Sequence, residues 1–159
     1  MSTVLEFGKH EGKTLVEVVF SDPAWFRWAI REGVFHDRGG PSLQHEAEII
    51  WLKARNIRKP RSYPAGSSVV YYYQGWTGKF MAVRILDDPQ YEEHADVRSL
   101  LDFGYASDAG RRDQLGQDLL TKGIKRILFG ENARVTLKMK EEFFADPDNF
   151  ELPMQQAAE

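Results

Sequence analysis

Hydrophobic positions between residues 42 and 54 recur at the spacing of one helix face. Ser42, a residue type that caps helices, follows a Gly-Gly-Pro stretch at 39–41. Pro60 and Pro64 lie beyond this segment and oppose its continuation. We therefore predict a helix that begins after Ser42 and buries the face formed by Leu43, Ala47, Ile50, Trp51 and Ala54.

Two segments rich in valine and aromatic residues come next, at 68–73 and 79–86. The Gln-Gly-Trp-Thr-Gly sequence between them is typical of a turn. In the second segment, Met81, Val83 and Ile85 alternate with Ala82 and Arg84, so one face should be buried. The pattern predicts a β-hairpin.

The chain after Pro89 is mainly of helical character. It predicts a helix over residues 96–103 and a longer one over 109–128, which Gly116 and Gly123 bend or divide. The core side of the longer helix is expected to comprise Leu115, Leu119, Leu120, Ile124, Ile127 and Leu128.

Thr136 is positioned to cap a last helix, which continues to Phe144 and ends at the Asp146-Pro147 dipeptide. Residues from about 154 onward show no periodicity and are expected to be loose. Helices at both ends of the chain and a central hairpin or small antiparallel sheet predict an α+β fold.

Glycines and lysines alternate near the amino terminus, in the run Phe7-Gly8-Lys9-His10-Glu11-Gly12-Lys13. Glycine accepts positive φ without steric cost, so the run indicates a tight turn that bears positive charge. Thr14 and Glu17 then form the sequence of a capping box at the start of a first helix. Asp22-Pro23 predicts the start of a second helix, and Gly33 its end.

This pattern resembles a small module at the carboxyl terminus of exodeoxyribonuclease X and in related bacterial and phage proteins. The shared features are a Phe-Gly-Lys-x-x-Gly-Lys turn and an Asp-Pro-x-aromatic helix, and they cover about residues 5–32. In that family the module accompanies nuclease domains, so the resemblance implies an accessory element for DNA and no catalysis. Glu11 departs from it by reducing the local positive charge. We therefore expect such a module at 1–37, an α+β body at 41–153 and a tail at 154–159.

A weaker internal similarity links the two ends of the chain. Phe7-Gly8 precedes Thr14-Leu15 by the same spacing as Phe129-Gly130 precedes Thr136-Leu137, and each unit continues to a Phe-x-Asp-Pro sequence. A degenerate duplication and a chance match both account for this similarity.

Composition limits the classes of protein. With 159 residues, of which 42% are hydrophobic, the chain can bury a core. The absence of cysteine excludes disulfides, thiol nucleophiles and cysteine-ligated zinc. There is neither an apolar run of about 20 residues nor a signal-peptide pattern, so we expect a cytoplasmic protein without membrane contact.

The net charge of -3 argues against binding nucleic acid by bulk positive charge. Acidic residues gather at 87–96, however, and cations gather in two groups. This segregation fits either a surface with one face for phosphates or ordinary solvated surfaces. The first basic group is Lys53, Arg55, Arg58, Lys59 and Arg61; the second is Arg111, Arg112, Lys122, Lys125 and Arg126.

The hairpin carries candidate base-stacking residues. Tyr72 should face away from Tyr71 and Tyr73, so part of that run belongs to the core. Trp76 lies in the loop between glycines and is the better candidate to stack on an unpaired base. The expected nucleic-acid-binding residues are Lys9, His10, Lys13, Lys53, Arg55, Arg58, Lys59, Arg61, Trp76 and Lys79.

Signatures of enzymes are lacking. There is no phosphate-binding loop, nucleophile elbow or dinucleotide fingerprint, and Ile49 stands where a zinc-protease helix starting at His45 needs a histidine. Glu11-Gly12-Lys13 has the Glu-x-Lys form of metal-dependent nucleases but lies in a glycine turn without an upstream aspartate. We expect no catalytic residues, no metal and no cofactor.

Three hypotheses follow, in the order in which the residues favour them. The first is a non-enzymatic DNA-associated accessory protein of phage or mobile-element origin. The second is a protein-binding adaptor or inhibitor that uses the aromatic hairpin and the acidic segment. The third is a metal-dependent enzyme built from dispersed acids and histidines such as His45 and His94.

Overall fold

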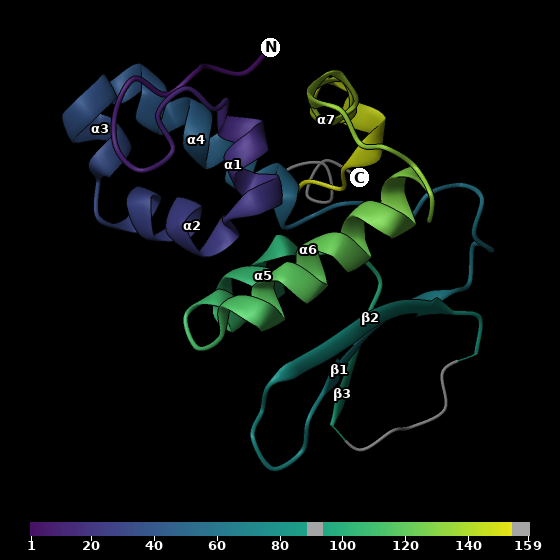
Figure 1. Ribbon diagram of the computed structural model, residues 1–159. Coiled ribbons are helices and arrows are strands. Elements are labelled where there is room, and N and C mark those ends of the chain that lie inside the picture. The colour runs from purple at the N-terminus through teal and green to yellow at the C-terminus, as the bar shows by residue number, and fades with distance from the viewer. Residues whose placement is uncertain (89–93, 154–159) are drawn as a thin grey trace.

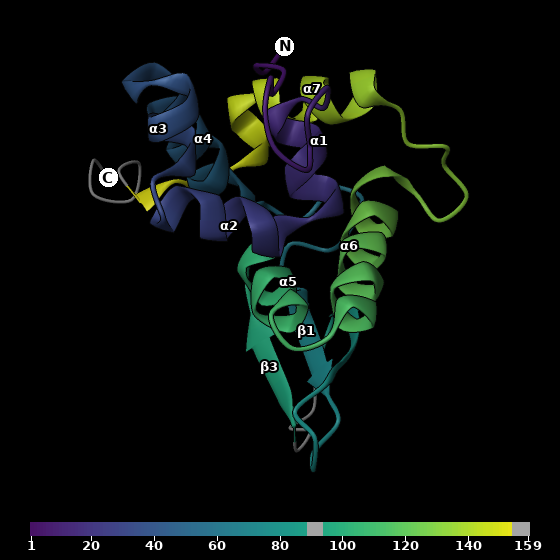
Figure 2. The same cartoon turned by 60° about the vertical axis from the view of Figure 1, so that its left-hand side comes forward.

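The computed structural model describes residues 1–88 and 94–153, and its fold is α+β (Figure 1). The expected tail and part of the acidic segment lie outside these residues. Helices α5 and α6 lie between the sheet and the other helices, which form the opposite end of the molecule (Figures 1 and 2). The elements are α1 (Leu15–Ser21), α2 (Pro23–Arg31), α3 (Val34–Gly39), α4 (Pro41–Ala54), β1 (Ser68–Tyr73), β2 (Phe80–Leu86), β3 (Ala95–Arg98), α5 (Phe103–Gly110), α6 (Gln114–Phe129), α7 (Leu137–Ala145) and the 3-10 turn η1 (Pro147–Asn149).

The glycine-rich run forms a closed turn ahead of α1. Leu5 N donates to the Lys13 carbonyl at 2.9 Å, and Gly12 N donates to the Leu5 carbonyl at 2.9 Å. Gly8 and Gly12 have φ of +76° and +87°, which a side chain would strain. The predicted capping box is confirmed, because the Thr14 side chain accepts from the backbone of Glu17 and the glutamate side chain accepts from Thr14 N.

The next three helices differ from the prediction at two points. Asp22 caps α2 as predicted, and Gly33 follows its end with φ +70°. The chain then forms α3, which the sequence analysis did not predict and which buries Phe35. Gly40, rather than Ser42, is the N-cap of α4, because the proline after it takes the first helical position.

The hairpin is confirmed, but the sheet has a third strand. The order is β2-β1-β3, with both pairs antiparallel. Val70 of β1 is opposite Arg84 of β2 and Val97 of β3. The predicted helix over 96–103 is therefore wrong, since its first part is β3, which pairs with β1. Helix α5 begins only after Asp102, whose side chain accepts from Gly104 N.

Side-chain alternation in the sheet follows the prediction except at a bulge. Tyr71 is fully buried, and Tyr72 is only half-buried on the opposite face. The register shifts between Tyr72 and Tyr73. The shift buries Phe80 and leaves Met81 exposed, so the expectation that Met81 is on the buried face is wrong.

Helix α6 is one uninterrupted helix, so its glycines do not divide it. They allow close packing instead: a Cβ at Gly123 would lie 2.7 Å from Val83 Cγ1. Because the glycines face the sheet, Leu115 and Leu119 lie on the solvent side of the helix and are 64% and 44% exposed. Their predicted core position is therefore wrong.

One hydrophobic core contains residues of both the amino-terminal segment and the rest of the chain. Phe20 of α1 contacts Phe144 of α7 edge to face, with ring centroids 5.7 Å apart, and Phe103 of α5 at 5.3 Å. The predicted cap of α7 is confirmed, since the Thr136 side chain accepts from Met139 N at 3.2 Å. One core therefore joins the segment before residues 37–41 to the segment after them.

The two segments with similar sequences also share their local order. Gly8 and Gly130 both have positive φ, and each segment then has a threonine-capped helix, α1 or α7. Each helix is followed by an Asp-Pro start, of α2 in one case and of η1 in the other. Phe20 and Phe144 occupy the same position in their segments, and they are the residues that contact each other.

Candidate functional site

A hollow of about 480 Å³ lies between the hairpin loop and the corner where α5 leads into α6. Its lining comes from two parts of the chain: residues 73–80 of the hairpin, and residues 105–116 of α5, the corner and α6. The lining residues are Tyr73, Thr77, Gly78, Lys79, Phe80, Tyr105, Asp108, Ala109, Arg111, Arg112, Asp113 and Gly116. We call it the hairpin hollow.

Two tyrosines give the hairpin hollow aromatic walls. Tyr105 stacks on Tyr71 with ring centroids 3.9 Å apart, and its hydroxyl accepts from Arg98 Nε at 2.8 Å and donates to Asp96 at 3.1 Å. Burial, and after it the Asp96 carboxylate, raises the pKa of Tyr73 above its usual range. The hollow therefore has fixed aromatic surfaces with uncharged phenols.

The charges of the hairpin hollow do not cancel. Asp108 is paired with Arg27 of α2 at 2.7 Å, and Asp113 caps α6 by accepting from Leu115 N. Within residues 1–88 and 94–153, no hydrogen bond or ion pair engages the side chains of the three cations that line the hollow, Lys79, Arg111 and Arg112. The acids are occupied and the cations are available, an arrangement that favours an anion.

Trp76 lies at the turn of the hairpin, directly before Thr77, which lines this hollow, and is 85% exposed. The loop that carries it is ordered by hydrogen bonds from Gly78 N to the Gln74 carbonyl at 2.7 Å and from the Thr77 hydroxyl to the Gln74 side chain. The His94 ring lies against Gly75, where a Cβ would be 2.3 Å from Nε2. The indole is thus held out on a fixed loop.

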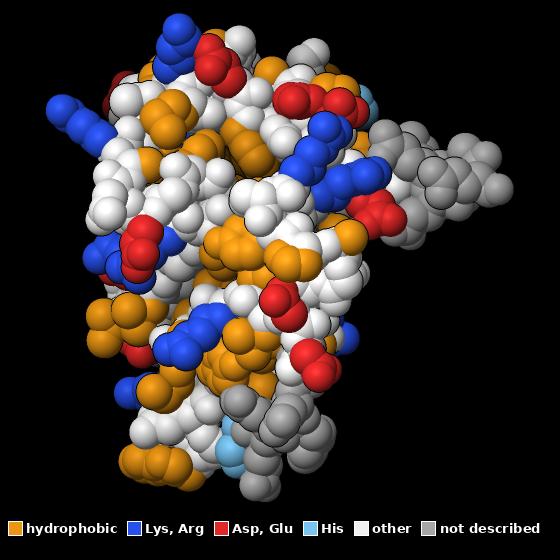
Figure 3. Space-filling model, turned by 90° about the vertical axis from the view of Figure 1, so that its right-hand side faces the viewer, with side chains coloured by type: hydrophobic (Ala, Val, Ile, Leu, Met, Phe, Trp, Pro, Cys, Tyr) orange, Lys and Arg blue, Asp and Glu red, His pale blue; other side chains and the backbone are white. Residues whose placement is uncertain are grey.

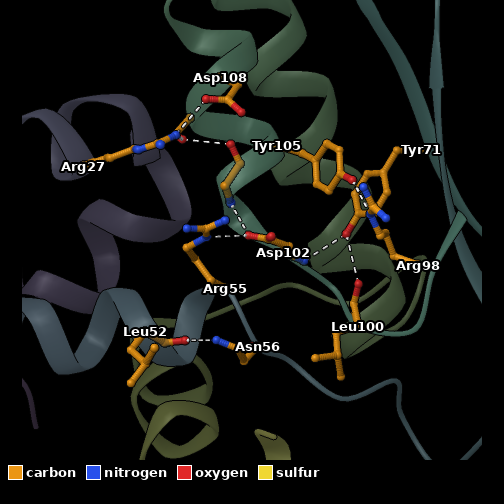
Figure 4. A network of polar contacts seen from close by, with 12 residues as sticks. Arg27, Leu52, Arg55, Asn56, Tyr71, Arg98, Leu100, Asp102, Tyr105 and Asp108 are labelled. Atoms are coloured by element: carbon orange, nitrogen blue, oxygen red, sulfur yellow. Dashed lines mark hydrogen bonds and ion pairs between the residues drawn. The ribbon is translucent and has the colours of Figure 1, made fainter. Parts of the chain in front are cut away.

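A network of polar contacts fixes the wall of the hairpin hollow to the rest of the fold (Figure 4). The buried Tyr71 hydroxyl accepts from Asp102 N at 2.9 Å and lies 3.3 Å from the Leu100 carbonyl, to which it donates. Asp102 in turn contacts Arg55 at 3.4 Å, and burial raises the pKa of this carboxyl. On the other side of α5, Arg27 bonds to Ser107 and Asp108.

The glycine turn places its predicted residues around Asp22. Lys9 Nζ and His10 Nε2 lie 3.0 and 2.9 Å from the same Asp22 oxygen, and Lys13 Nζ lies 3.5 Å from His10 Nδ1. His10 is only 5% exposed and packs edge to face on Trp25. Its two ring nitrogens are therefore engaged within the protein, whereas the Lys9 side chain remains largely exposed.

Asp22 also connects the turn to the corner beside the hairpin hollow. Its second oxygen accepts from Gln117 of α6 at 3.2 Å, and Gln117 accepts from Ala24 N at 2.9 Å. Gln117 is fully buried and lies against Gly110 at the end of α5. The glycine turn is therefore attached to the same end of α6 as the hollow.

The predicted basic run at 53–61 is largely engaged in holding the fold together. Lys53 donates to the Phe144 carbonyl at 3.1 Å, and Arg58 donates to the Phe150 carbonyl at 3.1 Å. Arg55 contacts Asp102, and Lys59 donates to the Ser67 carbonyl. Arg61 is the member of this run without such a contact among the described residues.

A larger hollow, of about 630 Å³, lies between β2 and the carboxyl end of α6. Its lining is mostly apolar, with Arg84, Arg126 and Glu131 as its charged members. The face drawn in Figure 3 has hydrophobic side chains across its middle. Arg84 lies over the Tyr72 ring, 5.9 Å from its centroid, and Glu131 adds a negative charge to the lining, so we do not include this hollow in the candidate site.

Within the described parts of the chain, no three metal-ligating side chains lie close enough together to hold an ion. His45 is exposed on α4, and the segment from 89 to 93, which contains the acids Glu92 and Glu93, is not described. In the same parts of the chain, the helices are too short or too polar to span a bilayer.

Comparison of the chain with protein families, curated proteins and solved structures found no match. Tyr73 and Tyr105 form the aromatic walls of the hairpin hollow, and the sequence did not indicate this role for either residue. Arg111 and Arg112 were recognised as basic, but no local pattern indicates that they line one hollow with Lys79.

Proposed function

We propose that the chain is a non-enzymatic DNA-associated protein that holds unpaired nucleotides at the hairpin hollow. The observation that carries the proposal is an exposed tryptophan, Trp76, on the same hairpin loop whose next residues line a hollow with three unengaged cations. Proteins that bind single-stranded nucleic acid combine a stacking surface with a positive groove for the backbone. The resemblance of residues 5–32 to a module that accompanies nucleases supports the same class of ligand.

Each group has a defined task in this proposal. The indole of Trp76 stacks on one base, and Lys79, Arg111 and Arg112 contact the phosphates that flank it. Tyr73 offers an aromatic wall to a neighbouring base or sugar. A hollow of about 480 Å³ is in the size range of small-ligand sites, which matches one nucleotide better than a duplex.

The glycine turn extends the positive surface toward α2. Lys9 forms an ion pair with Asp22, but its side chain is largely exposed. Lys13 is also exposed. The bond between Asp22 and Gln117 fixes this turn next to the α5–α6 corner. In this proposal Lys9 and Lys13 bind phosphates further along the strand, while His10 has the structural task of ordering the turn.

The test is fluorescence anisotropy with labelled single-stranded and double-stranded DNA over a salt series. We expect single strands to bind more tightly, with an affinity that falls as salt rises, because phosphate contacts release counterions. Trp76→Ala should weaken single-strand binding by about 1–3 kcal/mol, the usual contribution of one stacked base. Trp28→Ala is the matched control, since Trp28 is an exposed tryptophan of α2 away from the hollow.

Charge removal gives a second arm of the same test. Arg111→Gln with Arg112→Gln should reduce the salt dependence, because each lost phosphate contact removes about 0.7 from the slope of log affinity against log salt. Absence of binding at low salt, or binding that is unchanged by Trp76→Ala and by the arginine changes, contradicts the proposal.

The exposed apolar residues of the sheet favour a second candidate, a protein-binding adaptor. Met81 and Val97 are exposed in addition to Trp76. Aromatic and methionine side chains are common in protein interfaces. In that case Trp76→Ala would abolish the binding of a protein partner, DNA would not bind, and the interaction would show little dependence on salt.

A further inference from the structure

A second positively charged hollow lies at the carboxyl end of α6. It has a volume of about 280 Å³ and is formed by Lys122, Lys125 and Arg126 together with the connection that begins at Gly130. Lys140 of α7 adds a fourth positive charge close to Lys125. We call it the helix-end hollow. None of the proposed contacts described above involves it.

The charges around the helix-end hollow are poorly balanced. Across residues 1–88 and 94–153, no ion pair engages Lys122, Lys125 or Arg126. Lys140 lies over the Phe20 ring, 5.7 Å from its centroid. Glu131 lines the hollow, and Asp118 lies one to two turns earlier on α6.

Cations near a helix carboxyl terminus are often explained by the partial negative charge of that end. That explanation is insufficient for this cluster. Burial, and after it repulsion from Lys140 and Lys122, lowers the pKa of Lys125. At Lys125 the repulsions from Lys140 and from Lys122 each outweigh the attraction of Asp118. A bound anion would offset this repulsion.

An exposed stripe on α6 joins the two hollows. Leu115, Leu119, Lys122 and Arg126 follow one another at intervals of three or four residues, which places them along one side of the helix. Leu115 and Leu119 are exposed although they are large and apolar. In Figure 1 α6 runs diagonally across the front of the molecule, uncovered by other elements. The stripe begins beside Arg112 and ends at the helix-end hollow.

We propose that the helix-end hollow binds backbone phosphates of the same single strand whose unpaired nucleotide occupies the hairpin hollow. The proposal rests on the proposed function and assigns it a path along α6. The apolar side chains of Leu115 and Leu119 are the surface over which the intervening bases lie. The strand is thereby bound at two charged ends with an apolar middle.

The length of α6 sets the length of strand required. A rise of about 1.5 Å per residue places Gly116 and Arg126 roughly 15 Å apart along the helix axis. A stacked strand advances about 3.4 Å per nucleotide, so roughly four to five nucleotides join the hollows. An oligonucleotide of about three nucleotides reaches one hollow, and one of about twelve reaches both.

The experiment compares labelled oligothymidylates of about three and about twelve nucleotides by fluorescence anisotropy, using the whole chain. The test variant is Lys122→Gln with Lys125→Gln, which removes charge but keeps good helix formers. The control is Arg31→Gln with Arg38→Gln, an equal loss of charge on exposed residues of α2 and α3. Circular dichroism of all variants verifies the fold.

The wild-type chain should bind the longer oligonucleotide roughly tenfold or more tightly than the shorter one. The lysine variant should lose this difference, with a salt slope lower by about 1.4 on the longer strand and an unchanged affinity for the shorter one. The control should retain the difference. Equal weakening of both strands, an unchanged length dependence, or the same loss in the control overturns the helix-end site.

The failure of this proposal is distinct from that of the function on which it rests. If Trp76→Ala weakens binding of the short strand but the lysine variant changes nothing, the hairpin hollow is supported and the path along α6 is overturned. If the wild-type chain binds neither oligonucleotide at low salt, both proposals are overturned.

Discussion

The close approach of α6 to the sheet leads to a quantitative prediction for the substitution Gly123→Ala. A Cβ at this position would lie 2.7 Å from Val83 Cγ1, well inside the separation of about 3.5–4.0 Å at which carbon atoms attract. Val83 is buried and β-branched, so its side chain cannot rotate away easily. The added methyl group must therefore push α6 and β2 apart.

Two opposing effects set the size of the change. Overpacking of a core costs about 1–3 kcal/mol, and replacing a helical glycine by alanine contributes about 1 kcal/mol in the opposite direction. Gly116→Ala is the matched control on the same helix, because the nearest atoms to its Cβ would lie at ordinary contact distances of 3.5–3.8 Å. We expect Gly116→Ala to stabilise the fold by about 0.5–1 kcal/mol. Gly123→Ala should be about 1–3 kcal/mol less stable than this control.

Urea denaturation followed by circular dichroism measures both free energies of unfolding. Val83→Ala removes the clashing atom, so combining it with Gly123→Ala should show a favourable coupling of about 1 kcal/mol or more in a double-mutant cycle. Equal effects of the two glycine substitutions, or no coupling with Val83, would refute the close-packing explanation of Gly123.

Two further predictions concern buried polar groups. Burial lowers the pKa of His10 below its ordinary value of 6.5, so the unfolded chain binds a proton at a higher pH than the folded chain. The free energy of unfolding should therefore decrease as the pH falls through about 6.5, and urea titrations of His10→Gln at several pH values should lack this part of the slope. Tyr71→Phe removes a hydroxyl that bonds to Asp102 N and the Leu100 carbonyl, and should cost about 1–3 kcal/mol of stability. Tyr72→Phe, on the opposite face of the same strand, should change the thermal midpoint little, and equal losses in the two variants would contradict the role given to the buried hydroxyl.

The features that the sequence predicted correctly depend on neighbouring residues. The capping box at Thr14, the caps at Asp22 and Thr136, and the hairpin each depend on a few consecutive side chains, and the structure confirms them. Strand β3 depends instead on pairing with β1, a segment about twenty-five residues earlier, so its local pattern was mistaken for a helix.

Long-range packing also explains the misplaced face of α6. Leucines at 115 and 119 look like core positions by periodicity alone. The helix is rotated so that Gly116 and Gly123 face the sheet, because only glycine permits that approach. The surface of β2 therefore determines which face of α6 is buried, and the sequence of α6 alone carries no information about that surface.

The candidate site was predictable only in part for the same reason. Trp76 and Lys79 could be recognised because their loop lies within one hairpin. Tyr105 and Arg112 join them only when α5 packs against β1. The engagement of Lys53 with the Phe144 carbonyl joins positions far apart in the chain, so its structural task was hidden in a run that resembles a phosphate-binding patch.

The contact between Phe20 and Phe144 has a consequence for how the protein is made. Synthesis proceeds from the amino terminus, and domains in general fold as units while they emerge. Phe103 of α5 contacts the Phe20 ring, but the contact with Phe144 forms only when α7, synthesised more than a hundred residues after α1, reaches it. Until the ribosome has passed residue 144, the Phe20 ring of α1 is therefore only partly covered. Chaperones that bind exposed apolar segments would bind α1 during this time. The binding surface would be buried only when α7 packs against α1.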